Sequence, residues 1–324
     1  MKVPSINQCL YLSAIYISLI LALACSSDEM VDEPVTPASE DAPTESPSGP
    51  ISVTDALGQT LIFESIPEKI ASISPTATEI LYAAGGSSIL RDRASRFPEE
   101  VQALPDVGSA YEPSLEAVVA AQPDLVIIEA ITQARFAPRL VQSGLKVMAV
   151  KAESSEDVVN HITLVGRVIG KNDVAAQRVT EIEGRLNDIR NSDGRSVLML
   201  ISDQDRNLYA ARPESYTGLI AATLGMVNKA EGLEDSGPYP GFSLMSPESI
   251  LVANPDVIVT ITPAPEPAPR LSSTITQIPP FVALNAIQTG SIYEADVTLF
   301  LQAPGPRIVE AVEALKQGLE FKDS

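Results

Sequence analysis

Asn172-Asp-Val-Ala-Ala-Gln-Arg-Val-Thr-Glu-Ile-Glu-Gly-Arg-Leu-Asn-Asp-Ile-Arg190 is the stretch that decides the fold. Its apolar residues recur at the spacing of one helix face: Val174, Ala175, Val179, Ile182, Leu186 and Ile189. Asp173 in the first turn and Arg185 near the end suit the helix dipole. A second helical segment begins at Ser154 and meets this one near Gly170. These patterns predict a helical connector in the middle of the chain.

The sequence on either side of this helix carries one pattern twice. The two copies are Ser114-Leu-Glu-Ala-Val-Val-Ala-Ala-Gln-Pro-Asp-Leu-Val-Ile-Ile128 and Ser246-Pro-Glu-Ser-Ile-Leu-Val-Ala-Asn-Pro-Asp-Val-Ile-Val-Thr260. A helix that begins at a serine cap, ends before proline and leads into an apolar run is one helix–strand unit of a parallel sheet. The repeat predicts an α/β protein with two Rossmann-like three-layer lobes joined by a single long α-helix.

Strand and helix patterns alternate through the rest of each half. A hairpin is expected over 51–63, and a strand over 69–74 leads into a helix over 75–84, where Thr76 and Glu79 have capping-box spacing. We therefore place an N-terminal α/β lobe at 51–151, a helical connector at 152–193 and a C-terminal α/β lobe at 194–324. Because one helix is a stiff connection, the lobes should move little on ligand binding.

The first 50 residues differ from the rest. Within 1–25 the only charge is Lys2, and an apolar run too short to span a bilayer comfortably ends in small residues, which predicts a lipoprotein signal peptide. Leu21-Ala-Leu-Ala-Cys25 resembles the lipobox of bacterial lipoproteins, in which Cys25 is lipidated. A retained N-terminal membrane anchor is the alternative. The acidic, proline-rich segment 26–50 predicts a disordered tether.

Composition excludes several functions. A formal net charge of −20 argues against nucleic-acid binding. The only cysteines are Cys9 and Cys25, so the predicted lobes have no disulfide and no cysteine metal site. His161, the only histidine, is expected to be a partly exposed helix residue rather than a catalytic base. The chain has no phosphate loop and no nucleophile elbow, so we predict a protein that is not an enzyme and has no cofactor or metal of its own.

Ligands of open α/β sheets bind at loops that follow the carboxyl ends of the strands. The predicted ligand-binding residues of these loops are Ser74, Pro75, Thr76, Arg96, Phe97, Tyr111, Thr132 and Gln133, followed by Arg206, Arg212, Tyr216, Tyr239, Phe242 and Phe300. Aromatic faces with a few arginines suit a flat, partly anionic organic molecule. The alternative for each aromatic residue is packing in the core of its lobe.

Glu116 and Glu248 occupy the same place in the two copies of the repeat. Each is an acid in a first helical turn, a position that contributes roughly 0.3–1 kcal/mol through the helix dipole. The functional alternative is that the two acids, one on each lobe, dock onto paired basic sites of a partner.

A set of motifs spans much of the chain: Lys69-Ile-Ala-Ser-Ile-Ser-Pro-Thr-Ala-Thr-Glu-Ile-Leu-Tyr-Ala-Ala-Gly85, Leu104-Pro-Asp-Val-Gly108, Ser114-Leu-Glu116 with Pro123-Asp124, Ser246-Pro-Glu248 with Asn254-Pro-Asp256, and Pro304-Gly-Pro-Arg307. Together they resemble the helical-backbone (class III, cobalamin and ferric-siderophore type) substrate-binding proteins of ABC importers, over about Ile51 to Leu319. The resemblance implies a monomeric extracytoplasmic protein, anchored to the membrane through lipid at Cys25. It would capture a metal-chelate small molecule and deliver it to an ABC permease and its ATPase.

In that family, acids at the positions of Glu116 and Glu248 contact arginines of the permease. A tryptophan often found in the cobalamin pocket of the family is missing, because this chain has none. Three alternatives stay open: a haem carrier with Tyr111 or Tyr239 as axial ligand, a surface sensor that needs no permease, and an enzyme acting on the chelate. The sequence offers no nucleophile and base for the last of these.

Overall fold

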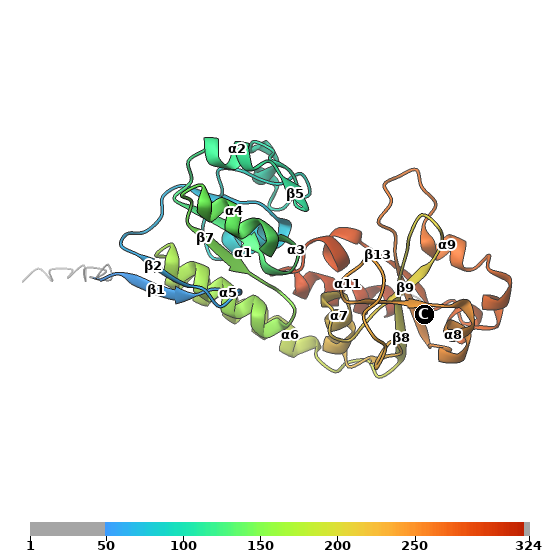
Figure 1. Ribbon diagram of the computed structural model, residues 1–324. Coiled ribbons are helices and arrows are strands. Elements are labelled where there is room, and N and C mark those ends of the chain that lie inside the picture. Colours follow the sequence, from blue (N-terminus) through green and yellow to red (C-terminus); the bar gives the residue numbers. More distant parts are fainter. Residues whose placement is uncertain (1–48, 321–324) are drawn as a thin grey trace, which may run out of the picture. The chain divides into compact units, whose positions relative to one another are not determined.

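The computed structural model describes residues 49–320, which belong to one compact unit. The predicted signal peptide, Cys25 and all but the end of the tether lie outside the described residues. The described chain contains two separate main sheets, one formed before the central helices and one after them (Figure 1). The predicted two-lobe α/β class is confirmed. The exact lobe boundaries stay a prediction.

The first sheet is parallel and three-stranded, in the order β3-β6-β7. The predicted hairpin precedes it, with a turn in which the Asp55 carboxylate accepts from the N–H groups of Leu57 and Gln59. The strands of this half are β1 (Ile51–Thr54), β2 (Thr60–Phe63), β3 (Ile70–Ser72), β4 (Gly108–Ser109), β5 (Glu112–Pro113), β6 (Leu125–Glu129) and β7 (Val147–Val150). The helices are α1 (Pro75–Ala83), η1 (Glu99–Ala103), α2 (Leu115–Ala120), α3 (Ala130–Gln133), η2 (Ala134–Phe136) and α4 (Ala137–Gln142).

The second sheet is mixed, in the order β11-β9-β8-β12-β13, with β10 paired to the start of β8. Strands β8, β12 and β13 are parallel, and β9 runs antiparallel to its neighbours. The strands are β8 (Ser196–Ser202), β9 (Leu208–Ala211), β10 (Val227–Asn228), β11 (Phe242–Met245), β12 (Val257–Ile261) and β13 (Ile292–Ala295). The helices are α7 (Tyr216–Leu224), α8 (Pro247–Ala253), α9 (Leu271–Ile275), η3 (Pro279–Ala283), α10 (Asn285–Gln288), η4 (Thr298–Gln302) and α11 (Ile308–Glu320).

Both sheets are covered on both faces, as three-layer units require. In β6 the side chains of Leu125 and Ile127 enter one core cluster, while Val126 and Ile128 enter another. The same alternation occurs in β8, where Met199 and its odd-numbered neighbours face one cluster and the even-numbered leucines face a different one. Strands buried on both faces explain why their sequences are continuous apolar runs.

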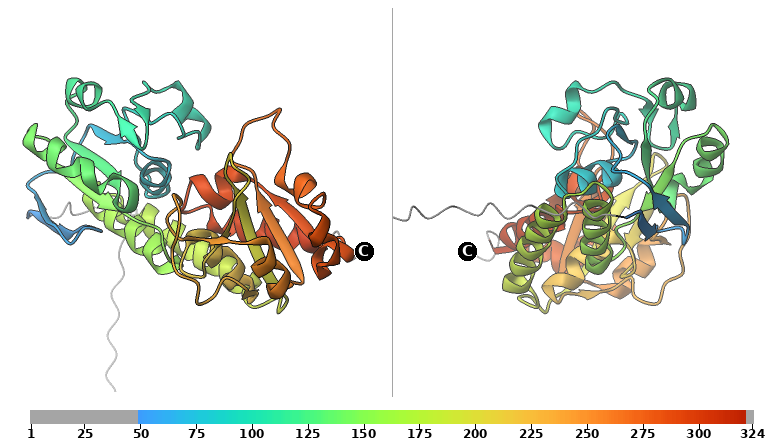
Figure 2. Two further views of the ribbon diagram at one scale, coloured as in Figure 1. Left: turned by 45° about the vertical axis from the view of Figure 1, so that its right-hand side comes forward. Right: turned by 90° about the vertical axis from the view of Figure 1, so that its left-hand side faces the viewer.

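The central connector consists of α5 (Ser155–Val168) and α6 (Asn172–Ile189), which lie side by side in Figure 2. They meet at Gly170, whose φ of 69° ends α5 in the left-handed region that glycine tolerates. Gly166 allows the close approach, because a Cβ there would lie 2.4 Å from that of Ala175. The predicted meeting point of the two helices is confirmed.

Helix α6 is fixed to both halves. Ile182 is 1% exposed in a core cluster that runs without a break from Ile80 of α1 to Ile220 of α7. Arg185 donates through Nε and Nη2 to Glu313 of α11, at 3.1 and 2.7 Å. This ion pair is partly exposed and adds little stability, so the shared apolar core is the main link. A shared core supports the expected small lobe movement.

The repeated Pro-Asp motif has the same structural role in both halves. Asp124 accepts from the N–H groups of Glu68 and Lys69, immediately before β3, at 3.0 and 2.8 Å. Asp256 accepts from the N–H and hydroxyl of Ser196, at the start of β8, at 2.9 and 2.7 Å. Each aspartate therefore fixes the start of its own strand beside a parallel neighbour.

Two local predictions were wrong. The cap of α1 is Ser74, whose Oγ accepts from the N–H of Ala77, because the fixed φ of Pro75 suits the first helical position and so places the cap at the residue before it. Thr76 and Glu79 form no capping box there. His161 is buried, at 8% exposed, and its Nδ1 lies 2.8 Å from the carbonyl oxygen of Asp157. Burial lowers the pKa of His161.

We predict that Asp124→Ala and Asp256→Ala each lower the free energy of unfolding by about 1–2 kcal/mol, since each leaves two strand-start donors without their carboxylate. Urea unfolding followed by circular dichroism measures the loss. Exposed Asp188 of α6 provides a matched control, and Asp188→Ala should stay within about 0.5 kcal/mol of the parent. Equal effects for all three variants would contradict the role assigned to the motif.

Candidate functional site

The loop from β3 to α1 is buried at the first edge. Ser74 and Thr76 are 2% and 3% exposed, and Pro75 is also buried. Their side chains build the start of α1 and offer little surface. Any ligand contact at this turn would come mainly from the backbone.

A second loop, after β6, is tied to this turn. Gln133 Nε2 donates to the carbonyl oxygens of Ile73 and Ala110, at 2.7 and 2.8 Å. Glu129 accepts from the N–H of Thr132 at 2.7 Å and from its hydroxyl at 2.7 Å. The structure therefore brings the first-lobe loops together, but the Thr132 hydroxyl proton is already used by the protein.

Exposed aromatic rings stand beside these loops. Tyr111 is 66% exposed at the tip of the β4–β5 turn, and its carbonyl oxygen accepts from Arg135. Phe97 is 43% exposed, and its ring lies 4.4 Å from the guanidinium carbon of Arg307. Arg96 is exposed next to it. These three residues are the predicted first-lobe contacts that present side-chain surface to a ligand.

A buried ion pair lies under this surface and joins the two halves. Arg307, at the start of α11, donates through Nε and Nη2 to the carboxylate of Glu79 on α1, at 3.0 and 2.5 Å. The two side chains are 10% and 3% exposed. Burial raises the pKa of Glu79 to about 7, and the arginine opposes that shift only in part. The pair fixes how the first-lobe loops face the second lobe.

Tyr216 lies close to this pair. Its hydroxyl is buried. Burial raises the pKa of Tyr216, and the nearby Glu79 charge raises it further. A buried, protonated phenol at this point is part of the floor between the halves rather than an exposed contact.

The remaining second-lobe candidates are divided between surface and core. Phe242 and Phe300 are 3% and 0% exposed in the main core cluster. These two aromatic residues therefore pack in the core and do not present a surface to a ligand. Tyr239 is half-buried, with its ring 5.1 Å from that of Tyr209 in an edge contact. Arg212 lies 3.2 Å from Glu214 and 3.8 Å from Asp235, so its charge is already balanced.

Sequence reasoning missed a small pocket at the carboxyl ends of β8 and β12. Its volume is about 130 Å³, and it is lined by Ser202, Asp203, Ile261, Thr262, Pro263, Ala264, Pro269, Leu271 and Thr274. The signal for it was present, because loops that follow parallel strands hold ligand sites in such sheets. The residues predicted to bind ligand in the second lobe are all aromatic or basic. The polar residues at 202–203 and in the loop after β12 are therefore absent from that prediction.

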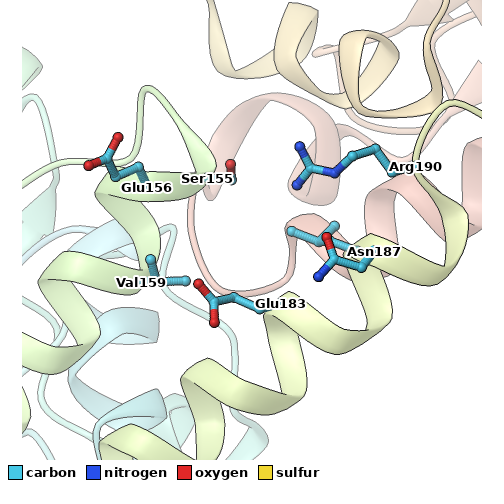
Figure 3. A pocket seen from close by; sticks show the side chains of 7 residues that line it. Ser155, Glu156, Val159, Glu183, Asn187 and Arg190 are labelled. Carbon is cyan, nitrogen blue, oxygen red and sulfur yellow. The ribbon is translucent and has the colours of Figure 1, made fainter. Parts of the chain in front are cut away.

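A larger cavity of about 320 Å³ lies between the start of α5 and the end of α6 (Figure 3). Glu183 and Asn187 of α6, with Arg190 just after that helix, line it opposite Ser155 and Val159 of α5. No aromatic ring is among the residues that line it. This cavity therefore does not suit a flat organic chelate.

Residues 49–320 contain neither a candidate metal cluster nor a candidate membrane span. No group of three or more His, Cys, Asp or Glu side chains in that range could hold a metal ion. No helix in the same range is long and apolar enough to cross a bilayer.

Two α/β lobes joined by a helical connector, with loops at the carboxyl edges of both sheets, are the architecture of helix-linked binding proteins. The comparison with known families agrees: the family described as "Periplasmic binding protein" matches residues 70–298, and the chain belongs to that family. Members of this family bind ligands for transport, so the protein is not an enzyme.

The relatives are similar over most of their length. The uncharacterized ABC transporter substrate-binding lipoprotein YvrC of Bacillus subtilis (strain 168) is 27% identical over 83% of this chain and 85% of that protein. The cobalamin-binding protein of Halobacterium salinarum (strain ATCC 29341 / DSM 671 / R1) is 25% identical over 93% and 82%. The catecholate-siderophore binding protein VctP of Vibrio cholerae has the same fold, with a TM-score of 0.69, 16% identity and coverage of 84% and 99%.

We predict that stability conferred by Glu79, relative to Glu79→Gln, decreases as pH rises. The folded pKa of about 7 lies above the unfolded value of 4.5, so the folded state binds more protons between these values. The contribution is complete below pH 4.5 and is lost as pH rises through 7, by up to about 3 kcal/mol. Urea unfolding of the parent and of Glu79→Gln at pH 4.5 and 7.5 measures this difference in the free energy of unfolding. The titration of His161 is common to both proteins, so its contribution cancels in the difference. A difference that grows with pH would show that Arg307 outweighs burial.

Proposed function

We propose that this protein captures a ferric siderophore or a cobalamin-type chelate outside the cytoplasm and delivers it to an ABC importer. The observation that carries the proposal is the pair of exposed rings, Phe97 and Tyr111, beside the joined loops at the carboxyl edge of the first sheet. Exposed aromatic faces at a strand-end edge suit a large, flat ligand. The iron or cobalt belongs to this ligand, and the protein needs no cofactor of its own.

The relatives support this ligand class. They include proteins named for binding cobalamin, and a Bacillus subtilis lipoprotein described as a probable siderophore-binding protein. The lipid anchor at Cys25, the monomeric state and the acidic tether complete the proposal. Relatives named as lipoproteins support the anchor.

Haem is the second candidate. Tyr111 is exposed and could place its phenol oxygen on haem iron, whereas the ring of Tyr239 packs against Tyr209. Among solved structures, the haem-binding protein BhuT shares the fold, with a TM-score of 0.68 at 19% identity. The likeness in fold does not choose between haem and the other chelates.

Titration of the purified protein with haem, cobalamin and several ferric chelates tests the ligand class. We expect saturable binding of a siderophore or a corrinoid, measured by visible spectra and tyrosine fluorescence. We expect no chemical turnover of the bound chelate. A charge-transfer band with haem that is lost in Tyr111→Phe and retained in Tyr239→Phe would replace the main proposal by the haem alternative. If the protein binds the chelate but cells do not need an ABC permease partner for its function, the surface-sensor alternative is favoured.

Docking on the permease is proposed for Glu116 and Glu248. Each is exposed in the first turn of a helix capped by serine, α2 or α8. Each helix leads through Pro-Asp into a strand that runs back, so its start lies toward the carboxyl edge of the sheet. Two acids on the ligand-facing side of both lobes can engage two basic sites at once, and each contact raises the effective concentration of the other.

We predict that the double variant Glu116→Lys/Glu248→Lys binds ligand with nearly unchanged affinity and abolishes uptake by cells, with single reversals intermediate. Paired exposed Glu153 and Glu320 provide a control, since reversal of both makes the same change in net charge. Normal uptake by the double variant would contradict the docking role, and so would a loss of ligand binding that precedes the loss of uptake. In either case the two acids act only by stabilising the starts of their helices through the helix dipole.

A further inference from the structure

The small pocket at the ends of β8 and β12 differs in chemistry from the aromatic surface of the first lobe. At about 130 Å³ it is well below the roughly 300–1,000 Å³ of pockets that enclose whole ligands. It has room for a side arm of a few non-hydrogen atoms. Its lining residues include one acid and no lysine, arginine or histidine.

Three hydroxyl groups line the pocket, and each donates its proton inside the protein. Ser202 donates to the carbonyl oxygen of Asp203 at 3.1 Å, and Thr262 donates to the Glu294 carboxylate at 2.6 Å. Thr274 donates to the carbonyl oxygen of Leu271 at 3.2 Å. The hydroxyls therefore have lone pairs, rather than protons, to offer to a ligand.

The backbone around the pocket is also poor in donors. Pro263 and Pro269 have no N–H group. The N–H of Leu271 is taken by Thr262 at 2.8 Å, and the N–H of Asp203 by the carbonyl oxygen of Asn207 at 3.2 Å. Two of the lining residues therefore have no backbone donor, and two more have a donor that the protein already uses.

Asp203 adds a negative charge to this wall. Its carboxylate accepts from Asn207 Nδ2 at 2.8 Å and from the Tyr209 hydroxyl at 3.0 Å. These hydrogen bonds, with that of Asn207 first, lower the pKa of Asp203, so it is ionised at neutral pH. Exposed Arg206 follows in the same turn but does not line the pocket, and Arg270 of the loop pairs with Glu266 at 2.7 Å.

Building on the proposed function, we propose that this pocket holds a hydrogen-bond-donating side arm of the chelate, a primary amide or an ammonium group, and rejects a carboxylate arm. An acceptor-lined wall satisfies N–H groups and leaves a carboxylate without donors beside a like charge. The pocket therefore selects among chelates by their arms, while the aromatic surface of the first lobe contacts the body of the ligand.

Matched ligand pairs test this. Dicyanocobinamide, with amide arms, is compared with the same corrin after hydrolysis of its amides to carboxylates. Ferrioxamine B, with a terminal ammonium, is compared with its N-succinyl derivative, which ends in a carboxylate. For the pair that binds, fluorescence titration should show that the donor-bearing ligand binds about tenfold or more tightly than its carboxylate counterpart. In Asp203→Asn this ratio of affinities should fall to about threefold or less.

Asp205→Asn is the matched control, because it removes a neighbouring exposed acid that does not line the pocket, and it should keep the preference. If Asp203→Asn fails to fold, Thr274→Val, on α9, should weaken the donor-bearing ligand several-fold. Equal binding of both members of a pair, or equal effects of Asp203→Asn and Asp205→Asn, overturns the inference and leaves the proposed function standing. Binding of neither pair overturns both.

Discussion

The buried pair between Glu79 and Arg307 is the directional polar contact that orients the two lobes, which also share one apolar core. It joins side chains that are 228 positions apart: Glu79 on α1 of the first lobe and Arg307 immediately before α11 of the second. Arg307 is the partner that opposes the effect of burial on Glu79, so its loss would leave the Glu79 carboxylate as an uncompensated buried charge. Because the guanidinium also lies under the ring of Phe97, the same contact that joins the lobes supports the exposed aromatic surface.

The apolar core complements this polar contact. The faces of both sheets that are turned toward α5, α6, α7 and α11 share one continuous cluster, so the lobes are not independent bodies on a tether. An ion pair fixes orientation, since its geometry is directional, whereas apolar burial supplies most of the free energy without direction. Such a link holds the predicted ligand loops in place, and loops that are already in place lower the entropic cost of binding.

The two edges differ in what they present. The first lobe presents exposed aromatic rings with Arg96 beside them, and the second presents a small pocket lined by acceptors. Many basic and aromatic residues of the second lobe serve other contacts: Arg212 is paired with acids, and Phe242 and Phe300 are core. The likeness between the lobes therefore ends at the scaffold. The repeated serine caps and Pro-Asp motifs build equivalent units, and the loops between them diverge.

The sequence by itself determined the scaffold. Helical periodicity over 172–190, the glycine at 170, the serine caps and the repeated Pro-Asp motif depend on neighbours a few positions apart, so their patterns are visible in one dimension. The partner of Glu79, the burial of Phe300 and the orientation of the pocket hydroxyls were decided only by the tertiary structure. The physical reason is that each depends on groups distant in sequence: packing selects which of several polar or aromatic residues meet, and composition alone leaves that choice open.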